Sequence, residues 1–297
     1  MMRIDLKPLL SPEWAQQEDY YVTTQQGASL SFITDGVKKL QIVFDNPYSV
    51  ITLAYSSNDN DWRDIVVDST GRATISIQDG RHSLMLRTWQ KDQALFWTSP
   101  LKLLSMSIDN GLVSPITQSQ PFLTFVGDSI TVGEEMASDG DHPELSYPVL
   151  VSKALQKPLA RIAYGGSGLT PFAPFQVPTA IESLWHVALN VPRPLVSTDI
   201  VVVNYGTNDL NYGASPQDFA FGLRVYLLEI IKRFHDAKIF ILLPFNGAFE
   251  TVFRNEMSRF EALTFINTNN WQIATDRVHP TVADHERIAK LILEELK

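Results

Sequence analysis

The sequence predicts a two-domain protein, with an antiparallel β-sandwich of the jelly-roll type followed by an α/β domain built on a parallel sheet. Short strand-like runs separated by turn residues fill the first third of the chain, and strand and helix patterns alternate after about residue 120. At 297 residues the chain is also long for one compact domain. We place the boundary between residues 115 and 116, which gives domains 1–115 and 116–297.

The strands expected in the first domain are rich in β-branched and aromatic residues, and turn signals such as Asp35-Gly36 separate them. They cover residues 29–35, 37–45, 50–56, 73–79 and 82–89. Ala73–Ile77 alternates between apolar and polar residues, so one face of that strand should point to solvent. Residues 108–120 are polar and bounded by proline, which predicts a linker.

The second domain should contain a parallel sheet with helices on both faces. Its expected strands are 122–126, 160–163, 200–204, 238–243 and 262–267, and its expected helices are 147–155, 216–235, 250–259 and 282–296. The run Ile200–Asn204 is apolar on both faces, as in a strand covered from both sides. In such sheets ligands bind at the carboxyl ends of the strands.

Composition excludes several classes of function. The formal net charge of −9 argues against a nucleic acid or an anionic membrane as partner. The chain has no cysteine, so disulfides, thiolate zinc sites and cysteine nucleophiles are excluded. The first residues carry no signal-peptide pattern, and no apolar run approaches the ~20 residues of a membrane span. We therefore expect a cytoplasmic protein without a membrane partner.

The first unusual motif is FVGDSITVG, residues 125–133, which follows a predicted strand. Ser129 would stand at the sheet edge at the start of a helix, where a hydroxyl can serve as a nucleophile. The alternative is that Asp128 or Ser129 only caps the helix. The motif is not the G-x-S-x-G elbow, because position 131 is threonine.

Two further motifs follow predicted strands. The loop 164–170, YGGSGLT, lets the backbone approach a ligand closely, and it lacks the Gly-Lys-Ser/Thr ending of a phosphate loop. In 205–209, YGTND, the Asn208 amide can donate to an oxyanion, and Asp209 can accept backbone N–H bonds. The alternatives are an ordinary tight loop and an Asx turn.

The fourth motif, TDRVHP at residues 275–280, precedes the last predicted helix. Asp276 and His279 are three residues apart, so the carboxylate can reach one imidazole nitrogen while the other accepts a proton from a serine. The alternative is a surface Asp-His pair. A metal site that adds Asp284 and His285 has no recognised ligand spacing, so we predict no metal.

Together the motifs GDS, SGxT, GTND and DxxH resemble the four blocks of the SGNH (GDSL-type) hydrolase superfamily, over residues 120–297. The resemblance implies a three-layer, flavodoxin-like α/β domain that hydrolyses esters without a cofactor. It also implies Ser129 as nucleophile, His279 as general base and Asp276 as the residue that orients His279.

The resemblance also implies three oxyanion donors: the Ser129 N–H, the Gly168 N–H and the Asn208 side chain. The Ser-Gly-x-Thr frame favours Gly168 over Gly166, and the choice between the two stays open. Tyr164 stands where an asparagine is common in this block.

The order of a jelly-roll-like domain and an SGNH domain resembles carbohydrate esterase family 2, whose members remove acetyl groups from sugars. This implies a carbohydrate O-acetylesterase acting on a small-molecule or oligosaccharide ester. The alternatives are a short-chain lipid or acyl (thio)esterase of the GDSL type and a non-catalytic carbohydrate-binding protein. Trp271 and Tyr205 are candidates for stacking on a sugar ring, with core packing as the alternative reading. The sequence leaves the oligomeric state open.

Overall fold

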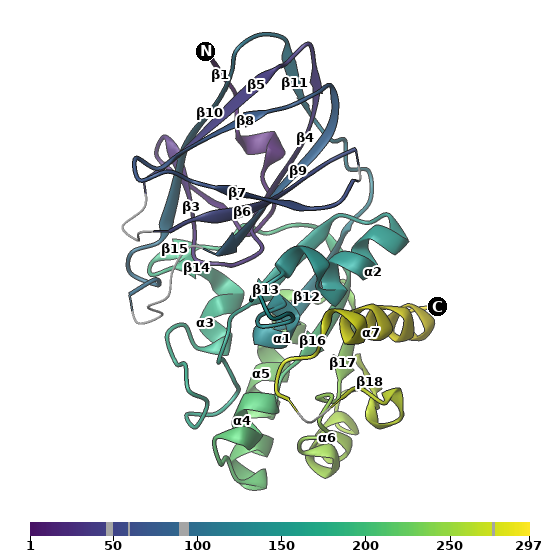
Figure 1. The fold of residues 1–297 in the computed structure, drawn as a ribbon. Helices are drawn as coiled ribbons and strands as arrows, with labels where there is room; N and C mark the ends of the chain where they lie inside the picture. The colour runs from purple at the N-terminus through teal and green to yellow at the C-terminus, as the bar shows by residue number, and fades with distance from the viewer. Residues whose placement is uncertain (46–49, 59, 89–94, 275–276) are drawn as a thin grey trace. The chain divides into compact units, whose positions relative to one another are not determined.

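The computed structural model describes residues 1–45, 50–58, 60–88, 95–274 and 277–297 (Figure 1). Its contacts divide the chain into two compact units, Met1–Ser119 with His186–Leu195, and Gln120–Trp185 with Val196–Lys297. The boundary at 115/116 stays a prediction.

The N-terminal unit is an antiparallel sandwich, which confirms the predicted fold class of this half. The first sheet has the order β2-β3-β10-β5-β8 with β1 paired to β10, and the second has the order β11-β4-β9-β6-β7. The first sheet comprises β1 (Met2–Arg3), β2 (Ala15–Gln17), β3 (Tyr20–Thr23), β5 (Lys39–Asp45), β8 (Arg72–Ser76) and β10 (Leu101–Ile108). The second comprises β4 (Ser29–Asp35), β6 (Thr52–Ser57), β7 (Arg63–Val66), β9 (Gly80–Thr88) and β11 (Leu112–Pro115).

Alternating burial explains why these residues form a sandwich. In β4 and β5 every second side chain is buried, and Phe32, Leu40 and Ile42 have no exposed surface. The apolar faces of both sheets supply the core, and their polar faces meet water. Residues 112–115 differ from the prediction, because they form an edge strand on β4 rather than part of a linker.

A short hairpin from the middle of the sequence belongs to the N-terminal unit. It consists of β14 (His186–Ala188) and β15 (Val191–Pro192), which pair antiparallel. Val187 is fully buried in a cluster with Ala15 and Val22.

The C-terminal unit contains the predicted parallel sheet, so this half of the fold class is confirmed as well. The strand order is β13-β12-β16-β17-β18, and all neighbouring strands are parallel. The strands are β12 (Phe122–Gly127), β13 (Leu159–Ala163), β16 (Thr198–Asn204), β17 (Lys238–Leu242) and β18 (Leu263–Ile266). In chain order this is the flavodoxin-like order 2-1-3-4-5.

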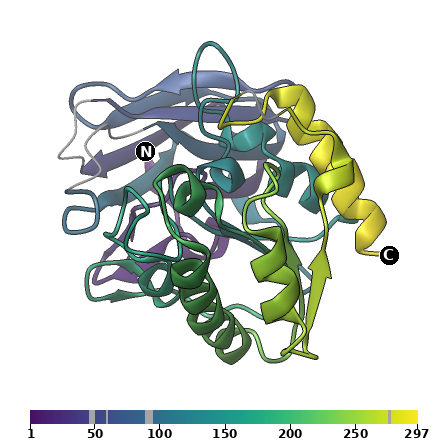
Figure 2. The same cartoon turned by 90° about the horizontal axis from the view of Figure 1, so that it is seen from below.

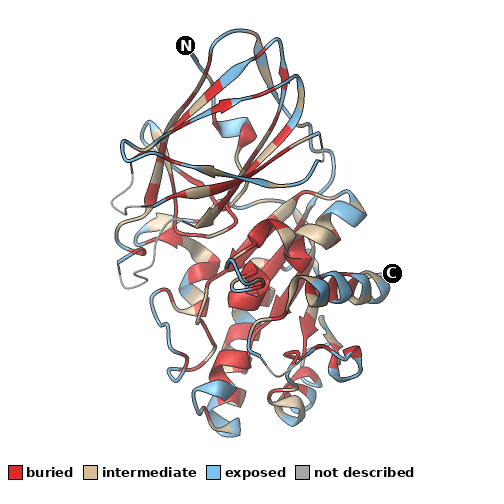
Figure 3. Ribbon diagram, in the orientation of Figure 1, coloured by how far each residue is buried: buried red, intermediate tan, exposed pale blue. Residues whose placement is uncertain are grey.

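Helices cover both faces of this sheet (Figures 1 and 2). Val202 of β16 points into a core shared with α1 (Ser129–Val132), α2 (Tyr147–Leu155) and α7 (Val282–Glu295). Val201 and Val203 point into the opposite core, shared with α3 (Ala180–Trp185), α5 (Pro216–Arg233) and α6 (Glu250–Met257). Figure 3 shows the burial of the central strands between these layers. The remaining helical segments are α4 (Thr207–Asn211) and the 3₁₀ turns Lys7–Leu9, Pro143–Leu145 and Asn269–Trp271.

The long helices of the C-terminal unit begin at well-formed caps. Ser215 caps α5 by accepting the Asp218 N–H, and Thr281 forms a capping box with Asp284 at the start of α7. Among the described residues, no helix combines the length and the apolar character needed to cross a bilayer.

Candidate active site

Ser129 is held at the carboxyl end of β12 by a tight turn into α1. The residue before the turn must be glycine, since a Cβ at Gly127 would lie 2.1 Å from Thr131 Oγ1 and 2.7 Å from Asn204 O. Asp128 caps α1 by accepting the Ile130 N–H at 3.0 Å, so the capping role considered for Asp128 is real. Ser129 follows the cap and is only 3% exposed.

His279 lies next to Ser129 although 150 residues separate them in the sequence. Its Nε2 is 3.0 Å from Ser129 Oγ, a hydrogen-bonding distance for a serine and its general base. The capping box of Thr281 and Asp284 starts α7 two residues after His279 and fixes the end of this segment. Asp284 is therefore engaged in a helix cap.

The second nitrogen of the His279 ring faces a residue that the sequence did not single out. His279 Nδ1 lies 2.9 Å from Glu135 Oε2. Asp276, the partner predicted from the Asp-x-x-His spacing, lies outside the described residues. Glu135 follows the GDSITVG motif by two residues, and its proximity to that motif was the one available signal.

The loop after β13 presents a buried N–H group near the end of the sheet. Gly168 is buried, and among the described residues its N–H has no hydrogen-bond acceptor. A Cβ at Gly168 would lie 2.6 Å from Ala173 Cβ and 2.7 Å from Asp209 Oδ2, so only glycine fits. A buried N–H without an acceptor is costly unless a ligand completes it. Gly166 needs glycine for a different reason, its positive φ of 68°.

The YGTND motif after β16 holds the Gly168 loop in place through hydrogen bonds. Asp209 is fully buried and accepts the Leu169 N–H at 3.0 Å, the Thr170 N–H at 2.8 Å and the Thr170 hydroxyl at 2.7 Å. Asn208 donates one side-chain N–H to Ser167 O at 2.9 Å. An amide carries two such hydrogens, so the second stays available to a ligand. β12, β13 and β16 are neighbours in the sheet, so Ser129, Gly168 and Asn208 follow adjacent strand ends.

Two carboxyl groups beside the serine have raised pKa values, so each carries less than a full negative charge near pH 7. Burial raises the pKa of Asp128 to about 7, and the nearby Asp209 carboxylate adds to the effect. Burial also raises the pKa of Glu134 to about 8, with further contributions from Asp141, Asp128 and Glu135. Fewer fixed negative charges near Ser129 favour an oxyanion forming there.

His285 is a buried structural residue of α7. It is fully buried, its Nδ1 accepts the Tyr147 N–H at 3.1 Å, and its ring stacks on Tyr147 with centroids 5.7 Å apart. Burial lowers its pKa to about 3. Neither His285 nor Asp284 is arranged as a metal ligand, and no group of three potential ligand residues occurs in the described parts of the chain.

Acidification should destabilise the folded protein because His285 is buried in its neutral form. The unfolded chain protonates His285 near pH 6.5 and the folded chain only near pH 3, so stability falls as pH is lowered through that window. Between about pH 6.5 and about pH 4.5 the wild type should lose roughly 2 kcal/mol more than His285→Asn, whose Oδ1 can replace Nδ1 as the acceptor for the Tyr147 N–H. Urea unfolding of both proteins at the two pH values measures this.

The difference between the two proteins isolates His285 from other titrating groups. Asp128 and Glu134 have raised pKa values, and their contribution to stability changes with pH in the opposite direction. Both groups are present in both proteins and cancel in the comparison. Equal losses of stability on acidification would contradict the assignment.

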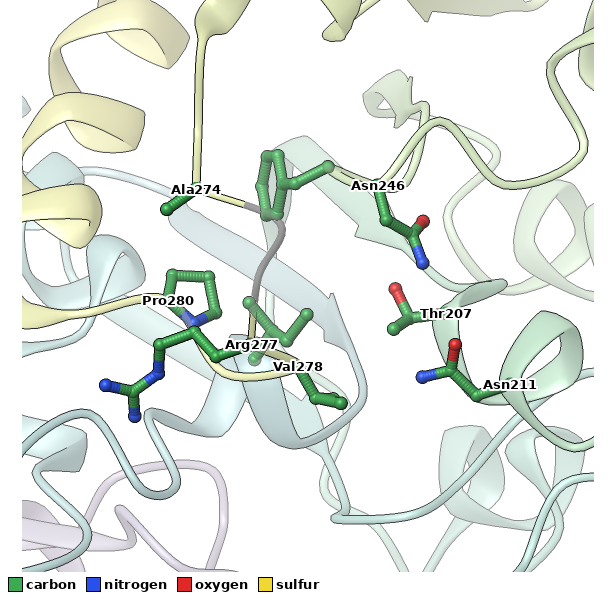
Figure 4. Close-up of a pocket in the computed structure, with 9 residues that line it drawn as sticks. Thr207, Asn211, Asn246, Ala274, Arg277, Val278 and Pro280 are labelled. Atoms are coloured by element: carbon green, nitrogen blue, oxygen red, sulfur yellow. The ribbon is translucent and has the colours of Figure 1, made fainter.

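A cavity of about 200 Å³ is lined in part by residues that directly precede or follow Ser129, Asn208 and His279 in the sequence. Its walls are formed by Ile130, Thr207, Asn211, Phe245, Asn246, Ala274, Arg277, Val278 and Pro280. Figure 4 shows Thr207, Asn211 and Asn246 facing one another on one side, while the Arg277 guanidinium points away from them. The cavity therefore has a polar wall opposite apolar side chains.

The two aromatic residues predicted to stack on a sugar are packed in the cores. Trp271 is 6% exposed and stacks on Phe245, and Tyr205 is 2% exposed against Tyr226. Their burial leaves almost no ring surface for a ligand. Phe172 and Tyr212, at 47% and 56% exposed, are the more accessible aromatics after the second and third motifs.

Comparison with protein families gives a match over more than half of the chain. Residues 125–287 match the GDSL-like lipase/acylhydrolase family. A comparison with curated protein sequences gives no match.

Solved structures resemble the whole chain at low sequence identity. A family two carbohydrate esterase from Clostridium thermocellum, an active-site mutant in complex with a cello-oligosaccharide, has a TM-score of 0.78 at 17% identity, covering 97% of each chain. The acetyl xylan esterase Est2A from Butyrivibrio proteoclasticus has a TM-score of 0.75 at 14% identity, covering 97% of this chain and 93% of its own. The salicylyl-acyltransferase SsfX3 from a tetracycline pathway has a TM-score of 0.63 at 15% identity, covering 96% and 93%. These likenesses show that both halves share the fold.

Proposed function

This chain belongs to the GDSL-like lipase/acylhydrolase family and is a carboxylic ester hydrolase, and we propose that its substrates are O-acetylated carbohydrates. The proposal for the reacting group is carried by one observation, the 3.0 Å contact between Ser129 Oγ and His279 Nε2 at the carboxyl end of the parallel sheet. We propose Ser129 as the nucleophile and His279 as its general base.

The proposed reaction is acyl transfer through a covalent intermediate. His279 Nε2 takes the Ser129 proton as Oγ attacks the ester carbonyl, and the oxyanion accepts from the Ser129 N–H, the Gly168 N–H and the Asn208 amide. The tetrahedral intermediate then releases the sugar alcohol, which receives its proton from His279. Water deprotonated by the same imidazole attacks the acyl-enzyme and frees the acid.

The carbohydrate part of the proposal is supported by the similar structures and by the cavity. One of the similar proteins is described as a family two carbohydrate esterase and another as an acetyl xylan esterase, and both match this chain over almost its full length. The cavity is small and has a polar wall, in which the buried Thr207 hydroxyl lacks a partner among the described residues. Such a wall suits a ligand rich in hydroxyl groups better than a long alkyl chain. Phe172 and Tyr212 are our candidates for sugar contacts.

A substrate panel tests the proposal. Acetylated mono- and oligosaccharides should be hydrolysed with kcat/KM at least about 10-fold above alkyl esters of longer acyl chains, since each poorly fitting methylene costs about 1–3 kcal/mol. The panel includes p-nitrophenyl acetate as a reference, and Ser129→Ala serves as the blank. A rate that rises with acyl length would instead favour the lipid or acyl (thio)esterase, and no Ser129-dependent hydrolysis would favour a binding protein.

One similar structure favours a second acceptor for the same acyl-enzyme. SsfX3 is described as a salicylyl-acyltransferase, so the second candidate function for this chain is acyl transfer to an acceptor other than water, such as an alcohol. Adding a polyol to the acetyl ester assay and quantifying acetylated polyol against free acetate separates the two outcomes. Free acetate as the main product supports hydrolysis.

A further inference from the structure

We propose that Glu135 is the positioning residue for His279, holding the imidazole so that Nε2 faces Ser129. The inference rests on the proposed function and deepens it, because it assigns the carboxylate that completes the serine and histidine pair. Glu135 stands outside the four motifs, in the loop that follows α1.

The geometry around the ring gives each nitrogen a separate role. Nε2 lies 3.0 Å from Ser129 Oγ, and Nδ1 lies 2.9 Å from Glu135 Oε2. If Nε2 accepts the serine proton, Nδ1 must carry the hydrogen of the neutral ring. A carboxylate is the acceptor that fixes this tautomer and stabilises the imidazolium formed during the reaction.

The backbone of Glu135 is fixed from both sides. Its N–H donates to Asp141 Oδ1 at 2.8 Å, and its carbonyl accepts from Arg277 Nη2 at 2.6 Å. Arg277 and His279 are on the same segment, so two contacts join this segment to Glu135. Loop 133–142 is closed by the His142 N–H, which donates to Gly133 O at 2.8 Å.

Glu135 also holds a backbone conformation that is unfavourable for its residue type. Its φ is +48°, in the left-handed region, which costs a residue with a Cβ about 1 kcal/mol or more. Such residues concentrate at functional sites, where the surrounding contacts hold them in place. The contacts to Asp141, Arg277 and His279 are the ones that hold this residue.

Glu135 takes the role that the sequence pattern assigned to Asp276, which lies outside the described residues. The Nδ1 of a neutral imidazole carries one hydrogen, and we assign it to Glu135. The Glu135 side chain is 72% exposed, so water screens its charge. Its removal should therefore cost less than the roughly 10⁴-fold loss seen when a buried triad carboxylate is removed.

Other charged groups near the ring set the background against which Glu135 acts. Arg277 lies on the same segment, His285 on α7 interacts with His279 electrostatically, and Glu134 and Asp141 flank Glu135. These groups are unchanged in a Glu135→Gln variant. The variant keeps the size of the side chain and removes only its charge.

Steady-state kinetics over about pH 5 to about pH 9 on an acetyl ester give the first readout. Glu135→Gln should lower kcat by about 10- to 100-fold with little change in KM, since a positioned base acts mainly in the transition state. The ascending limb of its pH profile should move to lower pH, because the imidazolium loses a neighbouring negative charge. Asp276→Asn should leave the limb in place.

A matched control uses a second histidine and acid pair of the same loop. Asp139 Oδ1 lies 2.9 Å from His142 Nε2, and Asp139 is exposed to a similar degree as Glu135. Asp139→Asn should leave kcat and the pH profile unchanged. An equal loss of kcat in Asp139→Asn would overturn the proposal, because it would show that either substitution acts by disturbing the conformation of loop 133–142.

Titration of the His279 ring followed by NMR separates this inference from the proposed function. In Glu135→Gln the ring should titrate at lower pH than in the wild type, whether or not the protein hydrolyses the ester tested. Unchanged titration and unchanged kcat in Glu135→Gln, with both altered in Asp276→Asn, would overturn the assignment. If the wild type hydrolyses no ester but the titration of His279 still differs between Glu135→Gln and the wild type, the proposed function is refuted and the contact between Glu135 and His279 is supported.

Discussion

Replacing Ser129 with alanine should lower kcat for an acetyl ester by about 10⁶-fold, and replacing His279 with alanine should cost about as much. The two side chains act as one unit, because Oγ becomes a nucleophile only when Nε2, 3.0 Å away, removes its proton. The Ser129→Ala and His279→Ala double variant should therefore be no slower than either single variant. Single-turnover rates measure the loss, and active-site titration of the wild type gives the concentration of competent enzyme to which the rates are referred.

Controls for this prediction exist in the same chain. Ser138 is an exposed serine of loop 133–142, and Ser138→Ala should retain full activity. His235 forms an exposed pair with Asp236 at 3.1 Å, and His235→Ala should also retain full activity. Losses in the single variants that simply multiply in the double variant would show that Ser129 and His279 act independently, against the proposed mechanism.

The elements that the sequence predicts well are those with a strong local pattern. β12 and β16 are apolar runs that end in the GDS and GTND motifs, and parallel strands bring such ends to one edge. This is why a sequence pattern can place Ser129 and Asn208 close together. The same reasoning extends to the Gly168 loop, since β13 is the other neighbour of β12.

The elements that the sequence does not reveal depend on contacts distant in the chain. β11 is an edge strand with mostly exposed residues, so it lacks the apolar alternation of a half-buried strand. β10 has an irregular register between Leu103 and Ser105, which interrupts its alternation. The hairpin of β14 and β15 joins the N-terminal unit only through packing such as that of Val187 against Ala15 and Val22.

The site shows the same division between local and distant information. Glu135 is an exposed glutamate in a polar loop, a type of residue that has no function at most positions. Its approach to His279 depends on the fold bringing two loops together across 144 residues. The aromatic candidates show the opposite error, in which the sequence suggests a function that the fold does not support. Trp271 and Tyr205 pack into hydrophobic cores, and no short sequence pattern distinguishes a buried aromatic residue from one that lines a binding site.

Asn208→Ala should lower kcat and kcat/KM together by about 10²–10³-fold, because its amide is expected to stabilise charge that exists only in the transition state. Asn208 is 6% exposed, and the bond of its side-chain amide to Ser167 O at 2.9 Å fixes the direction of the second N–H before substrate binds. A donor held in this way needs no reorganisation during the reaction.

Stability measurements separate this catalytic effect from a structural one. Asn208→Ala also removes the partner of Ser167 O, which should destabilise the fold by about 1–3 kcal/mol. Asn255→Ala, at an exposed position of α6, is the matched control and should keep kcat unchanged. If kcat of Asn208→Ala stays within about threefold of wild type while its stability falls, Asn208 supports the loop without binding the oxyanion. A loss of about 10²-fold in kcat with an unchanged KM under conditions where the variant is fully folded assigns the amide to the transition state.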